Sequence, residues 1–328
     1  MRKFILLIIL ISSYSNFARV LTANRYSAYK YILNITSSSP SFAYSHRKLK
    51  IGYSGFSIKT RRKSDNAEAN VFFDSNKIVS VLSNVNVINI GSGALTIDQN
   101  LSYMTFIGTD LIYVVTWYNQ DSNLYHAVQS TFAMQFQMFL NIAEALNTLP
   151  SIAFVGSQVR HLSINQSIEN LINSGIKGTM MLVIKPTQNA NQFSFGYVDL
   201  ASTCKRWDCH INWSDGYCYF DASENCCVSC RRFFNSGSLN IFKQYSFNKG
   251  LTTKTARLNN SINNLNNAIE PTTQLSGGTF SIGAWSEFSA NGYFENCSEV
   301  ILFPSDLIIP DLSLLELNQI NFLAIIIC

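Results

Sequence analysis

Hydrophobic and polar residues alternate along several short runs of this chain, which is the period of a β-strand with one face in water. Residues 56–61 show the pattern, with Phe56 and Ile58 separated by polar neighbours. Residues 111–118 are apolar almost throughout and rich in β-branched side chains, which predicts a central strand buried on both faces. Further strands are expected at 179–184, 193–198, 217–221, 241–247, 255–258, 280–283, 292–295 and 299–303.

Helical spacing is scarce. Pro40 can start a short helix that runs to about Lys50, and residues 162–174 carry apolar positions at intervals of three and four. Pro310 predicts the start of a last helix, with Leu312 on its apolar face. Many short strands with few helices predict an all-β protein, namely an antiparallel β-sandwich with a few short helices.

The N-terminus has the three regions of a secretory signal peptide. Residues 1–3 begin with Met and continue with two basic residues, 4–11 are apolar, and 12–15 are small or polar. The apolar run is too short to span a bilayer. We therefore expect a signal peptide at 1–18, a single mature domain at 19–328, secretion, and no membrane attachment after cleavage.

Composition fits a globular chain, because 47% of the 328 residues are hydrophobic and only 13% are charged. The formal charge of +4 comes largely from two basic clusters, at 46–50 and 59–63. Such clusters can attract nucleic acid. No nucleic-acid-binding motif accompanies them, so we expect a solvated basic face and no nucleic-acid partner.

Entry into the secretory route would make the cysteines candidates for disulfides. The chain has eight, at Cys204, Cys209, Cys218, Cys226, Cys227, Cys230, Cys297 and Cys328. The alternative is a zinc site built from these thiolates and His210. An oxidising compartment and the absence of a repeated Cys-x2-Cys pair favour disulfides, so no metal or other cofactor is expected. Calcium on loop acids such as Asp121 is possible, but no spacing requires it.

The stretch 213–227 concentrates acids, aromatic rings and thiols within fifteen residues. Asp215 and Gly216 form a turn pair, and the alternation that follows predicts a strand that ends near Asp221 and Glu224. Carboxylates at a strand end beside aromatic rings suit the binding or cleavage of a sugar. The alternative interpretation is that Asp215 and Asp221 are turn formers and that Glu224 is a solvated loop acid.

Several short motifs occur in one order along the chain: Tyr53-Ser-Gly55, Arg61-Arg-Lys-Ser-Asp65, Val115-Thr-Trp-Tyr-Asn-Gln-Asp-Ser-Asn-Leu-Tyr-His-Ala-Val-Gln129, Ile282-Gly283, Gly292-Tyr-Phe-Glu295 and Phe303-Pro-Ser-Asp306. With these motifs the chain resembles the catalytic domain of α-L-arabinofuranosidase B. The resemblance implies a concanavalin-like, jelly-roll β-sandwich that acts on arabinose side chains of plant polysaccharide. It also implies a structural hydrogen bond for His126.

The resemblance implies catalytic roles residue by residue. The family's nucleophile is a Glu eight residues after an Asp-Gly pair and followed by Asn, which is the position of Glu224. The family's general acid is an Asp two residues beyond Ile-Gly, where this chain has Trp285, so the nearest acid, Glu287, takes that role. Asp221 is the substitute for either. A retaining glycosidase holds its two carboxyls about 5 Å apart.

Substrate contacts are expected from the same stretch and from the late loop. The candidate sugar-binding residues are Trp213, Asp215, Tyr219, Cys226, Cys227 and Trp285. The family has a vicinal Cys-Cys pair against the sugar, and Cys226-Cys227 is such a pair; for the rings, core packing is the alternative. Two functions follow: a secreted arabinofuranosidase, or a sandwich that only binds carbohydrate or a cell-surface partner.

Overall fold

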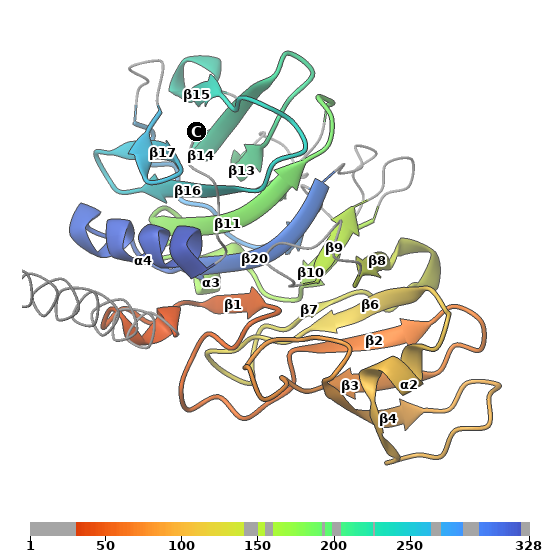
Figure 1. Ribbon diagram of the computed structural model, residues 1–328. Coiled ribbons are helices and arrows are strands. Elements are labelled where there is room, and N and C mark those ends of the chain that lie inside the picture. The colour runs from red at the N-terminus through yellow and green to blue at the C-terminus, as the bar shows by residue number, and fades with distance from the viewer. Residues whose placement is uncertain are drawn as a thin grey trace, which may run out of the picture.

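A computed structural model describes residues 31–140, 150–154, 160–191, 194–198, 205–225, 227–263, 270–284 and 295–322. Among these residues all strand pairings are antiparallel, and the ladder is continuous but folds back on itself as two facing sheets. The expected all-β sandwich with few helices is confirmed (Figure 1).

The first sheet, here the β11 sheet, has β20 and β11 at its centre, with β1 and β9 beside β20 and β16 beside β11. Its strands are β1 (Phe42–Ser45), β9 (Ser151–Phe154), β20 (Glu295–Phe303), β11 (Gly178–Pro186), β16 (Lys243–Lys249), β17 (Lys254–Leu258) and β18 (Ser261–Ile262).

The second sheet, here the β14 sheet, carries the candidate site. In order across the sheet its strands are β7 (Ala127–Val128), β10 (Leu162–Ile164), β19 (Phe280–Ile282), β12 (Phe195–Val198), β13 (Lys205–His210), β14 (Tyr217–Asn225) and β15 (Arg232–Asn235).

A third group of strands joins the two sheets at one end. It contains β2 (Ile58–Arg62), β3 (Glu68–Val71), β4 (Asn84–Asn89), β5 (Asn100–Ser102), β6 (Ile112–Trp117) and β8 (Phe136–Phe139). Strand β6 is the junction, because it pairs with β7 of the β14 sheet and, through β8 and β9, reaches β20 of the β11 sheet. The short helices are α2 (Tyr103–Ile107), α3 (Ile168–Leu171) and the 3-10 turns η1 (Ile32–Asn34), η2 (Phe132–Met134) and η3 (Val228–Cys230).

Aromatic rings hold the two sheets face to face. The ring of Phe247 on β16 lies 5.6 Å from Phe195 and 5.2 Å from Phe220, both on the β14 sheet. Trp207 on β13 is fully buried and packs against Phe220. Burial of such large apolar surfaces is the main favourable term in folding and fixes which face of β13 and β14 points inward.

The last helix, α4 (Ile309–Phe322), covers the outer face of the β11 sheet (Figure 1). Its residues Leu312 and Leu315 are buried in one cluster with Met181 on β11 and Ile301 on β20. The apolar face predicted for this helix is therefore confirmed. No helix among the described residues is long and apolar enough to cross a membrane.

Strand predictions hold where alternation or β-branching is strong, as at β2, β6, β11 and β17. Asn259 and Asn260, a residue pair that by its type favours a tight turn, form the hairpin turn between β17 and β18, with φ of 49° and 64°. Asparagine tolerates this left-handed region, which the tight hairpin turn requires.

One helix prediction is wrong, and that of a helical turn or two within 162–174 holds in part. Residues 42–45 form strand β1, buried along its whole length beside β20, instead of a helix from Pro40 to Lys50. Pairing with a distant strand overrode the local signal. Of the segment 162–174, only Ile168–Leu171 is helical, and Leu162–Ile164 is strand β10.

The prediction of a solvated basic face is wrong for three basic residues of these clusters, His46, Arg47 and Arg61, which are buried. Arg47 is fully buried and pairs with Glu299, whereas His46 is buried and stacks on Trp117 at 5.2 Å. Arg61 is also buried and donates a hydrogen bond to Gln135. Arg47 and Arg61 therefore carry charges that the fold uses in internal contacts.

Candidate functional site

The site is built on the hairpin of β13 and β14, where acidic and basic residues lie directly opposite one another. Asp208 pairs with Asp221, His210 with Tyr219, and Arg206 with Glu224. Directly opposed residues project from the same face of a sheet. That face is the outer one, because the intervening residues Trp207 and Phe220 point into the core.

A β-bulge brings Glu224 to this face. The register shifts between Arg206 and Trp207, and Ser223 has a positive φ of 56°. In a regular strand Glu224, three residues after Asp221, would point to the opposite side; the extra residue restores the same side. Ser223 is anchored because its hydroxyl donates to the carbonyl of Ile176 and its own carbonyl accepts from Thr273.

The prediction of a strand that ends near Asp221 and Glu224 is confirmed, because strand β14 ends at Asn225, directly after Glu224. The alternative interpretation is wrong for both acids, since both belong to the strand and neither is a turn former or a solvated loop acid. Asp221 is fully buried and Glu224 is 2% exposed.

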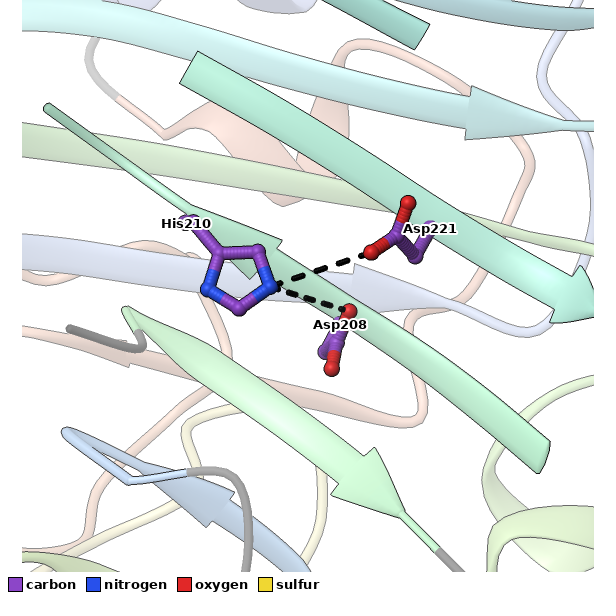
Figure 2. Close-up of side chains that lie close together, drawn as sticks. All are labelled: Asp208, His210 and Asp221. Carbon is purple, nitrogen blue, oxygen red and sulfur yellow. Dashed lines mark ion pairs between the residues drawn. The ribbon is translucent and has the colours of Figure 1, made fainter. Parts of the chain in front are cut away.

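Asp208, His210 and Asp221 converge within this hairpin (Figure 2). The Nε2 atom of His210 lies 3.8 Å from Oδ1 of Asp208 and 3.8 Å from Oδ2 of Asp221. Arg231 forms two hydrogen bonds to Asp221: its Nε donates to Oδ1 at 2.7 Å and its Nη2 donates to Oδ2. Arg206 adds a further contact to Oδ2 at 3.4 Å. Bidentate pairing of this kind is strong and directional.

The surroundings shift the pKa values of Asp208 and Asp221 in opposite directions. Burial acts to raise the pKa of Asp221, but its interactions with His210 and Arg231 outweigh burial and hold that pKa well below the usual range. Burial raises the pKa of Asp208 to about 7; His210 opposes the rise, while the charge of Asp221 adds to it. Neither oxygen of Asp208 accepts a hydrogen bond from the described residues.

Glu224 also holds a proton at neutral pH. Burial raises the pKa of Glu224 to about 8, the charge of Asp221 adds to the rise, and Lys254 opposes it. Its Oε2 atom lies 3.9 Å from Nζ of Lys254, and its Oε1 atom 4.0 Å from Nε of Arg206. Burial in turn lowers the pKa of Lys254. The hairpin thus holds one ionised carboxylate and two carboxyls that retain protons near pH 7.

Aromatic rings border the cluster. The ring of Trp213 meets His210 edge-on at 4.5 Å, and the guanidinium of Arg231 lies 4.9 Å from the ring of Tyr219. Both rings are partly exposed, so core packing alone does not explain them. Asp215 is the predicted turn former, with Oδ1 accepting from the Tyr217 amide, and its Oδ2 accepts the Tyr219 hydroxyl at 2.5 Å.

The described cysteines are arranged differently from the expected pattern. Cys227 forms a disulfide with Cys230, so it is not in a vicinal disulfide with its neighbour. Cys209 and Cys218 are both buried, with sulfurs 3.6 Å apart near the turn of the hairpin. Cys226 lies outside the described residues, as do Trp285 and Glu287.

A metal is a further possibility for the cluster. One ligand atom each from Asp208, His210 and Asp221 lie within 4.8 Å of one another, a set of donors that suits a divalent transition metal. Arg231 already holds both oxygens of Asp221, however, and a cation would have to displace it. The positive charges of the two arginines therefore disfavour a cation at this cluster.

Sequence reasoning missed Arg206, Asp208, Arg231 and Lys254. A signal for two of them was present, since residues 205–210 alternate between polar residues and Trp207 or Cys209. Arg231 and Lys254 carried no such signal, because only the pairing of β15 with β14 and the contact of β17 with β15 bring them to the acids.

No protein-family model and no curated protein matches the chain. A crystal structure of an arabinofuranosidase complexed with arabinofuranosyl-α-1,2-xylobiose matches with a TM-score of 0.60 at 14% identity, over 88% of this chain and 63% of that one. A GH54 α-L-arabinofuranosidase soaked with a cyclic sulfate inhibitor matches with the same values. This chain therefore spans 63% of the length of these structures. The matches confirm the arabinofuranosidase-like fold.

Proposed function

We propose that the protein hydrolyses α-L-arabinofuranosides at the cluster of Asp208, Asp221 and Glu224. The observation that carries the proposal is the convergence of three buried carboxyls on one face of the hairpin of β13 and β14, beside two partly exposed rings. A glycosidase needs one ionised and one protonated carboxyl at the scissile bond. The similar structures support the substrate class, since one of them holds an arabinofuranosyl-xylobiose.

Glu224 is the proposed nucleophile. Its Oε2 accepts no hydrogen bond from the described residues, whereas Arg231 holds both oxygens of Asp221 and makes that carboxylate a poor attacking group. Attack requires the ionised form, and Glu224 has a pKa of about 8. On 4-nitrophenyl α-L-arabinofuranoside, whose leaving group needs no proton, the hydrolysis rate should therefore rise with pH up to about 8. If Glu224 were the proton donor, the rate on an arabinosylated oligosaccharide would instead fall as the pH rises through about 8.

Two residues compete for the role of general acid. Glu287 is the residue that the family resemblance suggests, and Asp208 is the second candidate because it retains a proton near neutral pH within the cluster. Nitrophenolate leaves without protonation, so a variant lacking the general acid keeps much of its rate on 4-nitrophenyl α-L-arabinofuranoside. The same variant loses about 10²–10⁴-fold on an arabinosylated oligosaccharide.

The experiment compares Glu224→Gln, Asp208→Asn and Glu287→Gln on both substrates. Glu224→Gln should lose about 10³-fold or more on both, whereas the acid variant should lose only on the oligosaccharide. Glu68→Gln on β3, which removes a half-buried carboxylate 3.7 Å from Lys59, is the matched control and should stay within twofold of the parent on both. Full activity of Glu224→Gln on the nitrophenyl substrate would refute the assignment.

Carbohydrate binding without turnover is the second candidate. Trp285 at the position where the similar family has its acid favours it, as does the clamp of Arg231 on Asp221. Retention of arabinoxylan on affinity electrophoresis, with no product from either substrate, would support this function over hydrolysis. Secretion also stays a proposal, and N-terminal sequencing of the exported protein would test cleavage after Ser15 or Ala18.

A further inference from the structure

A row of directly paired residues crosses the outer face of the β14 sheet, starting at the acid cluster. In this row each residue lies directly opposite the next, in the order Asp221, Asp208, Gly196, Ser281, Ser163 and Val128. Their sequence neighbours Phe195, Phe280 and Leu162 point into the core, which confirms that the row lies on the outer face. The acids and the last two residues of the row therefore face the same side of the protein.

The far end of the row opens into a cavity of about 430 Å³. Val128 and Ser163 form part of its wall, together with His126, Thr131, Met134 and His161. This volume falls within the range of sites that hold small ligands. The cavity is distinct from the acid cluster, because Gly196 and Ser281 between them are buried.

The lining is neutral and rich in hydrogen-bonding groups. Ser130, Thr131 and Ser163 supply hydroxyls that both donate and accept. His126 supplies a donor, because its Nδ1 accepts the amide of Asn119, as the expected structural role requires, and its Nε2 then carries the proton. Burial lowers the pKa of His126, which keeps the ring neutral. Hydroxyl and imidazole groups beside Met134 suit the alternating polar and apolar faces of a sugar ring better than they suit an ion.

We infer that this cavity is a second carbohydrate site, which binds the backbone of the polysaccharide whose side chain reaches the acids. Asp208 and Ser163 are three strands apart, roughly 14 Å at about 4.8 Å per strand. One extended polymer can span that distance along this side of the protein, passing over the chain that buries Gly196 and Ser281. The inference rests on the proposed function. Two linked contacts to one polymer raise its affinity without changing that of a single arabinofuranoside.

The test uses Ser163→Leu, which fills the cavity from a strand position outside the core. Ser261→Leu on β18, an exposed strand position of the other sheet, is the matched control. Ser163→Leu should raise KM for arabinoxylan about tenfold or more while kcat/KM for 4-nitrophenyl α-L-arabinofuranoside stays within twofold. Ser261→Leu should change neither, and an equal rise of KM in both variants would overturn the inference.

Binding of an unbranched xylo-oligosaccharide, measured by calorimetry, separates this inference from the proposed function. Glu224→Gln should bind the oligosaccharide as the parent does, and Ser163→Leu should lose at least tenfold in affinity. Such a result stands even if the parent hydrolyses no arabinofuranoside, in which case the proposed function fails alone. No binding by the parent, or equal binding by Ser163→Leu, overturns the second site.

Discussion

Glu299 on β20 and Glu224 on β14 are both buried glutamates beside a cation, but their surroundings differ. Glu299 is fully bonded: Oε2 accepts from Ser45 and Arg47, and Oε1 accepts from Arg47 and Gln319. Oε2 of Glu224 accepts no hydrogen bond from the described residues, and its nearest cation there, Nζ of Lys254, stays at 3.9 Å. Complete bonding compensates for desolvation, whereas incomplete bonding leaves a carboxyl that favours its proton.

The pair of Arg257 and Glu316 follows the Glu299 pattern. Both oxygens of Glu316 accept bonds from Arg257, and the pair ties α4 to β17. Glutamates whose carboxylate oxygens all accept hydrogen bonds thus join elements of the fold. The incompletely bonded glutamate, Glu224, lies where catalysis is proposed. Stored electrostatic strain of this kind is typical of functional sites.

The largest expected effect is on Glu299. Glu299→Gln leaves the fully buried Arg47 without its countercharge, which should cost about 3–5 kcal/mol in the free energy of unfolding. Urea denaturation measures the loss, and kcat on the nitrophenyl substrate, per folded molecule, should stay unchanged. A loss below about 1 kcal/mol would show that bonding of the carboxylate does not distinguish the two glutamates.

The second expected effect is on the pH dependence of the free energy of unfolding, through the titration of Glu224. Its pKa rises on folding from 4.5 to about 8, so the stability it contributes is complete below about pH 4 and is lost as the pH rises through about 8. The free energy of unfolding should fall by about 1.4 kcal/mol per pH unit from this group between pH 5 and pH 8. Glu224→Gln removes the titration, and its stability should fall less steeply with pH. Parallel curves for the two proteins would contradict a raised pKa.

The smallest expected change in the free energy of unfolding tests burial separately from distance, in an ion pair at the surface. Lys50 and Asp121 lie 2.7 Å apart, the same distance as Arg47 and Glu299, but Lys50 is 37% exposed. Lys50→Met should cost less than about 1 kcal/mol in urea denaturation, because water screens the pair. A loss comparable to that of Glu299→Gln would mean that distance, and not burial, sets the strength of these ion pairs.

Local patterns in the sequence determined much of the sandwich. Alternation fixed β2, continuous β-branched residues fixed β6, and Asn259-Asn260 fixed a hairpin, because side-chain period and turn geometry depend on neighbours along the chain. The stretch around Glu224 was identified in the same way, from acids and rings crowded between a turn and a strand.

Only the tertiary structure decided the surroundings of those acids. The pairing of β1 with β20, the bulge at Ser223, and the approach of Arg231 and Lys254 depend on contacts that alternation does not encode. Arg47 illustrates the limit, since its partner Glu299 lies 252 residues away and converts a basic cluster from a surface feature into a core element. The period of the hydrophobic pattern shows which residues share a face of a strand. The protonation of a carboxyl depends instead on the distant charges that the fold brings near it and on how much water it excludes.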